Sequence, residues 1–222
     1  MKETKVNIRI ILLVVTHFLI LNVISNLDIF ITLSDVQYYS LMYGMVICIA
    51  LLSIFLFVKS GKGRIYGKFH FRWTYLGVLF LSLILFFIWS YMTSLIFPMT
   101  RNTALALRGA AELTGGAYVL VRIIAPIVVA PLQEEFLYRG LVMTSLERYK
   151  SFGLDLLVSS SLFSLTHVLQ HGWVTTDFVL YFGMGIILGT LFRYTRSIYW
   201  SIVAHVLWNT FVVVVSILVF GY

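Results

Sequence analysis

The feature that most constrains this sequence is a series of long apolar blocks that occupy most of its length. Hydrophobic residues make up 60% of the 222 residues and charged residues 11%, whereas a soluble domain has about 45–50% and about 25%. The mean hydropathy is +0.97. Blocks of this kind suit the hydrocarbon interior of a bilayer, which about 20 helical residues cross. The composition therefore excludes a disordered chain, a fibrous repeat and an ordinary cytosolic globule.

Short polar stretches separate seven apolar segments, and we interpret each segment as a membrane-crossing helix. The segments are residues 8–27, 38–58, 73–97, 117–147, 154–170, 177–193 and 198–220. The sequence thus predicts an all-α, polytopic helical bundle. It contains no repeat or flexible linker that would divide it. We expect one membrane domain over residues 1–222, with three N-terminal spans in residues 1–100 and a four-helix core in residues 110–222.

Positive charges gather on one side of these predicted spans. If the N-terminus is cytoplasmic, twelve of the 16 Lys and Arg residues fall on the cytoplasmic side and only Arg101 and Arg108 on the other. Cytoplasmic loops are enriched in Lys and Arg, so this split predicts a cytoplasmic N-terminus. The net charge of +7 then suits the anionic membrane face and does not indicate nucleic acid. The twelve cations are Lys2, Lys5, Arg9, Lys59, Lys62, Arg64, Lys68, Arg72, Arg148, Lys150, Arg193 and Arg196.

The fourth apolar segment carries charged residues, which are rare in membrane-spanning helices. Charged groups at membrane depth are costly and usually serve function. On an α-helix, Glu135 and Arg139 are four residues apart and share a face, so they can neutralise each other. Glu134 is turned about 100° away, and Tyr138 stands at its own i+4 position. Glu134 is therefore free to face another group, and a carboxylate in that position can act as a general base.

Histidines in two later segments can meet this carboxylate. His167 lies within the fifth segment, and His205 and Asn209 lie four apart on one face of the seventh. Buried polar groups need partners, and three separate helices satisfy them most simply around one hydrated cavity. We therefore predict that Glu134, His167, His205 and Asn209 share a site. For His17 in the first segment we expect a hydrogen-bonded packing role instead.

This set of side chains suits hydrolysis of an amide by water. A carboxylate with a histidine can position and deprotonate water, and a second histidine with an asparagine can stabilise the developing oxyanion. No Gly-x-Ser-x-Gly turn indicates a serine nucleophile. The alternative is a metal, because Glu134, His167 and His205 form a legitimate zinc ligand set. We prefer the mechanism without a cofactor and keep Zn²⁺ as its alternative.

Three ordered motifs resemble those of a known family. Glu134-Glu135-x-x-x-Arg139, then Phe163-x-x-x-His167, then His205-x-x-x-Asn209 resemble the CPBP (Abi) intramembrane proteases. That family includes the CAAX prenyl endoprotease and bacterial proteins linked to bacteriocin processing and self-immunity. The resemblance covers roughly the last 110 residues, and the first three spans match only as apolar helices.

The resemblance implies a role for each matched residue. Glu134 and His167 would activate water, His205 and Asn209 would form the oxyanion pocket, and Glu135 and Arg139 would support them. It implies an endopeptidase of the bacterial plasma membrane that cuts a peptide precursor or a membrane-protein tail, with bacteriocin processing or self-immunity as one use. Two other classes stay open: a non-proteolytic immunity or scaffold protein, and a small transporter with a proton relay.

Overall fold

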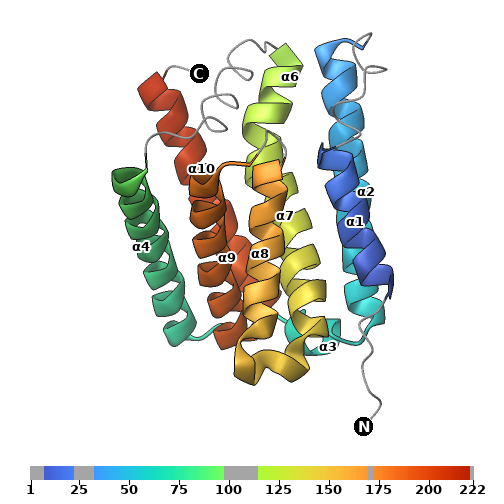
Figure 1. Ribbon diagram of the computed structural model, residues 1–222, viewed down its shortest axis with the longest axis vertical. Coiled ribbons are helices and arrows are strands. Elements are labelled where there is room, and N and C mark those ends of the chain that lie inside the picture. Colours follow the sequence, from blue (N-terminus) through green and yellow to red (C-terminus); the bar gives the residue numbers. More distant parts are fainter. Residues whose placement is uncertain (1–7, 23–32, 98–114, 170–172, 221–222) are drawn as a thin grey trace.

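The computed structural model describes residues 8–22, 33–97, 115–169 and 173–220, and in these residues it contains helices and no strands. Upright helices stand side by side in one bundle (Figure 1). In chain order the helices are α1 (Ile8–Asn22), α2 (Asp35–Lys59), α3 (Gly63–Tyr66), α4 (Trp73–Ile96), α6 (Gly115–Val119), η3 (Leu120–Val129), α7 (Ala130–Glu134), η4 (Glu135–Met143), η5 (Glu147–Phe152), α8 (Leu154–Leu169), α9 (Thr175–Thr195) and α10 (Ile198–Phe220). The predicted all-α class is confirmed.

Each of the seven predicted apolar segments coincides with helix over most of its described residues. Four helices within the described residues are long and apolar enough to cross a membrane: Val36–Lys59, Trp73–Ile96, Thr175–Thr195 and Ile198–Leu218. Ile8–Leu21 and Leu154–Leu169 are apolar but shorter. The outward faces carry large apolar side chains, such as Phe80 and Leu95 on α4, that are more than 60% exposed. These features make the molecule a polytopic helical membrane protein, whereas the cytoplasmic N-terminus stays a prediction.

Local sequence explains where the second helix begins. Ser34 accepts a hydrogen bond from the amide of Gln37 at 3.4 Å, and the Gln37 side chain accepts one from the amide of Ser34 at 3.1 Å. This reciprocal capping box satisfies two amides that the first helical turn leaves without partners. The α2 helix then continues through an apolar run as far as Lys59.

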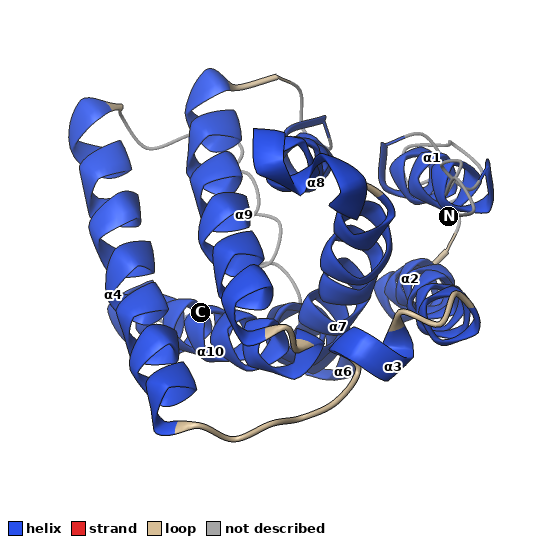
Figure 2. Cartoon of the chain, turned by 90° about the horizontal axis from the view of Figure 1, so that it is seen from below, coloured by secondary structure: helices blue, strands red, loops and turns tan. Residues whose placement is uncertain are grey.

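The segment from residue 115 to residue 143 lies at the centre of the bundle. It contacts α2, α8, α9 and α10, and the view along the helices shows these four around it, with α4 at the far edge (Figure 2). Its inner side chains are buried, and Leu137, Tyr138 and Leu141 are at most 1% exposed. The polar side chains on its buried face therefore lie in the interior of the molecule.

The central segment departs from regular α-helical geometry, and its two prolines, Pro126 and Pro131, are expected to interrupt a helix. Residues Leu120–Val129 and Glu135–Met143 follow wider π-helical turns, separated by five α-helical residues. Two prolines account for the first of these stretches, because Pro126 and Pro131 have no amide hydrogen and interrupt the regular hydrogen-bond ladder there. The amide of Ala130 consequently donates to the carbonyl of Ala125, five residues earlier. Such wide turns occur frequently at functional sites.

Candidate active site

A fully buried ion pair ties the central segment to its neighbours. The guanidinium of Arg139 donates to Oε1 of Glu135 at 3.0 Å, and both side chains are 0% exposed. Arg139 also donates to the carbonyl oxygen of Gly185 on α9 at 3.1 Å and lies 4.7 Å from the ring centre of Phe163 on α8. A β-carbon at Gly185 would lie 2.8 Å from that of Ser160, so glycine is required where α8 and α9 approach. The pair thus fixes three helices relative to one another.

His205 joins this network from the last helix. Its Nδ1 atom lies 2.9 Å from Oε1 of Glu135, so Nδ1 donates to a carboxylate that can only accept. This hydrogen bond sets the direction of the ring and leaves Nε2 facing Glu134, with 3.6 Å between Nε2 and Oε2. Glu135 is therefore shared between a guanidinium and an imidazole. Its neighbour Glu134 is free of both hydrogen bonds.

Glu134 lies between the two imidazoles. Its Oε1 atom is 3.8 Å from Nε2 of His167, and its Oε2 atom is 3.6 Å from Nε2 of His205. Both distances are longer than a hydrogen bond, and each is short enough for one water oxygen to contact both groups. The side chain of Glu134 is 11% exposed, so the carboxylate is accessible but surrounded by protein.

The orientation of His167 is fixed by its own helix. Its Nδ1 atom lies 2.9 Å from the carbonyl oxygen of Phe163, one helical turn earlier, so the ring donates there. The ring also stacks on Tyr181, with 4.0 Å between the ring centres. With its hydrogen on Nδ1, a neutral ring presents the lone pair of Nε2 to Glu134.

Asn209 is held by the backbone of the central segment. Its side-chain amide donates to the carbonyl oxygen of Pro126 at 2.7 Å. That carbonyl has lost its usual donor, because the amide of Ala130 has turned to Ala125 and the next residue, Pro131, has no amide hydrogen. The wide turn therefore frees a carbonyl oxygen, and the side chain of Asn209 supplies its hydrogen-bond donor. One amide hydrogen of Asn209 remains for another acceptor.

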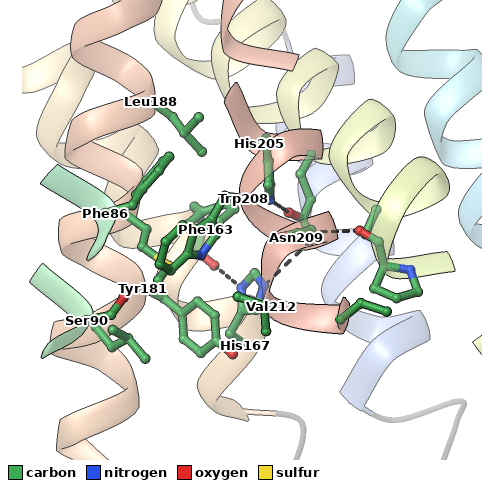
Figure 3. A pocket seen from close by; sticks show the side chains of 16 residues that line it. Phe86, Ser90, Phe163, His167, Tyr181, Leu188, His205, Trp208, Asn209 and Val212 are labelled. Carbon is green, nitrogen blue, oxygen red and sulfur yellow. Dashed lines mark hydrogen bonds and ion pairs between the residues drawn. The ribbon is translucent and has the colours of Figure 1, made fainter. Parts of the chain in front are cut away.

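A cavity of about 440 Å³ opens beside these residues (Figure 3). Glu134, His167, His205 and Asn209 line one side of it. The rest of its wall includes apolar side chains from α4, α9 and α10, namely Phe86, Leu180, Met184, Leu188, Trp208 and Val212. A cavity with a few converging polar groups and an apolar wall is typical of a substrate site.

The structure thus brings together all six residues singled out from the sequence, although their roles stay predictions. It also adds residues that the sequence did not indicate. Tyr181 supports His167, the carbonyl groups of Pro126 and Gly185 hold Asn209 and Arg139, and Phe86 brings α4 into the cavity wall. No sequence signal distinguishes Tyr181 or Phe86 from other aromatic residues in apolar segments.

The donor atoms of Glu134, His167 and His205 have the chemistry of zinc ligands. Even so, no three His, Cys, Asp or Glu side chains in the described part of the chain are arranged so that they could hold a metal ion.

One known family matches the part of the sequence that holds this site. Residues 116–211 match the sequence model of the type II CAAX prenyl endopeptidase Rce1-like family. The family resemblance is confirmed for these residues. They include all six site residues and exclude α1, α2 and α4.

Two relatives match a similar length. The putative membrane peptidase YdiL of Bacillus subtilis is 32% identical over 100 residues, which are 45% of this chain and 38% of that protein. The membrane-embedded CAAX protease MroQ of Staphylococcus aureus is 31% identical over 100 residues, 41% of this chain and 37% of the relative. The matches thus span well under half of each relative. No solved structure matches the chain. Together with the apolar helices, these relatives indicate a multi-pass membrane protein.

Proposed function

We propose that this protein is a membrane-embedded endopeptidase that hydrolyses a peptide bond by direct attack of water. One observation carries the proposal: Glu134 faces Nε2 of both His167 and His205 at the wall of a cavity large enough for a peptide segment. The family match over residues 116–211 and the two membrane peptidases support the same reaction class.

The geometry suggests how water would be activated. Glu134 and the Nε2 lone pair of His167 are both acceptors, so they can hold the two hydrogens of one water molecule. The oxygen lone pair of that water then points into the cavity, toward a substrate carbonyl. As the carbon–oxygen bond forms, Glu134 takes one proton. When the tetrahedral intermediate collapses, the same proton passes to the departing amine, which leaves the enzyme in its starting state.

His205 and Asn209 are proposed to stabilise the oxyanion that forms in this step. Asn209 has one amide hydrogen beyond the one that it gives to Pro126. Because Nδ1 of His205 donates to Glu135, a second donor on Nε2 requires the doubly protonated ring. Donors fixed before the reaction, in a cavity with an apolar wall, stabilise a developing charge more than water does.

The apolar cavity wall favours an apolar peptide segment as the substrate. We infer that a peptide precursor or a membrane-protein tail enters from the bilayer of a bacterial plasma membrane. Bacteriocin processing or self-immunity would be one use of such an activity. A metal-free mechanism is part of the proposal: chelator treatment should leave activity intact, and stoichiometric zinc together with chelator-sensitive activity would contradict it.

The decisive test is Glu134→Gln, which keeps the size of the side chain and removes its base. We expect this variant to lower the cleavage rate by about 100- to 10,000-fold and an uncut precursor to accumulate in membranes of cells that carry it. Glu147→Gln is the matched control, because Glu147 begins η5 and does not line the larger cavity. This variant should cleave at the wild-type rate. If Glu134→Gln, His167→Ala and His205→Ala all keep full biological activity, the scaffold alternative replaces the protease. Ion-coupled flux in proteoliposomes would instead favour a transporter.

A further inference from the structure

A second cavity lies on the other side of the candidate active site. It has a volume of about 160 Å³ and is lined by side chains of α1, α2, α7 and α8. It shares Ala130, Glu134 and His167 with the larger cavity, so Glu134 and His167 are accessible from both. We call this second cavity the inner chamber. It is the place where α1 and α2, which lie outside the family match, reach the site.

Two polar side chains that line the inner chamber lack hydrogen-bond partners for ring or amide nitrogens among the described residues. His17 is 1% exposed, and neither of its ring nitrogens has a hydrogen-bond partner among the described residues. Gln133 is also 1% exposed, and its side-chain nitrogen has no partner within the same residues. Both line the chamber, together with Tyr43. His17 is packed as expected, but the hydrogen bond expected for it is not found among the described residues.

Leaving such groups unpaired is unfavourable, and buried polar groups are almost always satisfied by protein or by ordered water. A volume of 160 Å³ is far above the roughly 15 Å³ that one water molecule needs, and a buried water typically makes about three hydrogen bonds. Glu134 and His167 supply acceptors at one end of the chamber, and His17, Tyr43 and Gln133 supply polar groups around it. Water in this chamber would give these polar groups partners, although Leu21, Val46 and Ala130 also line it.

We propose that the inner chamber is a water-binding site that delivers the hydrolytic water to Glu134 and His167, and that His17 is a positioning residue for this water. The inference rests on the proposed function. The peptide would occupy the larger, apolar cavity, while water reaches the carboxylate from the opposite side. An enzyme that hydrolyses bonds among apolar helices needs such a supply, because the substrate itself displaces water from its own cavity. The first helix, which the family motifs leave without a role, thereby contributes to the reaction.

The kinetic test uses the full chain in lipid nanodiscs and compares three variants. His17→Leu removes the polar atoms, whereas His17→Gln keeps a donor and an acceptor. Val14→Ala is the control, because Val14 is buried on the same helix and does not line the chamber. We expect His17→Leu to lower kcat about tenfold with KM within about twofold. His17→Gln should recover most of this loss, and Val14→Ala should change neither constant.

A second measurement does not depend on activity. A structure of the wild-type protein in nanodiscs, at a resolution that shows water, should contain ordered waters within hydrogen-bond distance of His17 and Gln133. The same structure of His17→Leu should lose the water at that position. A dry inner chamber would overturn the proposal even if the protein is a protease. Ordered water with unchanged kcat in His17→Leu would overturn the delivery role. If the wild type cleaves nothing while the chamber is hydrated, the proposed function fails and the water site stands.

Discussion

The molecule has two polar regions that use the same residue types in opposite surroundings. The interior centre consists of Glu134, Glu135, Arg139, His167 and His205. The helix-end cluster joins α3, η5, α8 and α9 through Tyr66, Glu147, Asp155 and Arg193, with Lys62 directly before α3. In the centre, the ion pair Glu135–Arg139 has no exposed surface, whereas Lys62 and Glu147 are 24% and 31% exposed.

The two regions also differ in whether each carboxylate has a cation as its partner. In the cluster every carboxylate has a cation of its own: Glu147 pairs with Lys62, and Asp155 pairs with Arg193. In the centre there are two carboxylates and one guanidinium, and Glu135 takes the guanidinium. The remaining carboxylate, Glu134, faces only imidazoles. In the helix-end cluster the paired charges join helices. In the interior centre Glu134 has no cation of its own among the described residues and can accept a proton.

The largest effect should come from removing the cation of the centre. Arg139→Met leaves Glu135 buried without its guanidinium, which should destabilise the protein by about 3–5 kcal/mol. Lys62→Met, the matched change in the cluster, should shift stability by only about 0–1 kcal/mol because that pair is partly exposed. Thermal unfolding of both variants in nanodiscs measures the difference. Equal shifts would show that the two ion pairs do not differ as described.

A smaller effect on stability, together with a loss of rate, is expected from Asn209→Ala. The substitution removes the proposed oxyanion donor and leaves the carbonyl of Pro126 without its side-chain partner. We expect kcat to fall about 100-fold, as for the loss of one oxyanion donor in other enzymes. Thr210→Val is the control on the same helix, because the hydroxyl of Thr210 donates only to its own helix at Val206. A similar loss of kcat in both variants would assign the effect to α10 as a whole.

The smallest effect concerns pH and the helix-end cluster. Burial raises the pKa of Glu147, but the hydrogen bonds from Lys62 and Tyr66 outweigh it and hold that pKa below its usual value of 4.5. A carboxyl whose pKa is lowered in the folded state stabilises the fold above its unfolded pKa and loses this contribution as pH falls through the folded value. The melting temperature should therefore fall below about pH 4.5, and less steeply in Glu147→Gln. Identical pH profiles for the two proteins would contradict this assignment.

Much of the fold follows from the sequence, because apolar block length is a local property. All seven blocks coincide with helices, and the four-residue spacing of Glu135 and Arg139 places them in contact. Order along the chain also suffices to group Glu134 with two histidines, since buried polar groups have few places to find partners. These inferences need only helical periodicity and the cost of burying charge.

Other features could not be predicted because they depend on packing between helices. The wide turns around Pro126 and Pro131 suit the interior only because Asn209, 83 residues after Pro126, satisfies the exposed carbonyl. Tyr181 supports His167 across two helices, and no spacing within either one indicates that contact. The sequence predicts only a packing role for His17, because a lone histidine in an apolar helix gives no information about the cavity beside it.

The wide turn before Pro131 has a consequence for how the carboxylate is aimed. A helix with one surplus residue in a turn directs everything after it about 100° away from where a regular helix would point. Deleting a single residue between Ile127 and Ala130 would keep every functional side chain in the protein and still swing Glu134 out of reach of both rings. The number of residues between Pro126 and Glu134 therefore determines the direction in which the Glu134 carboxylate points.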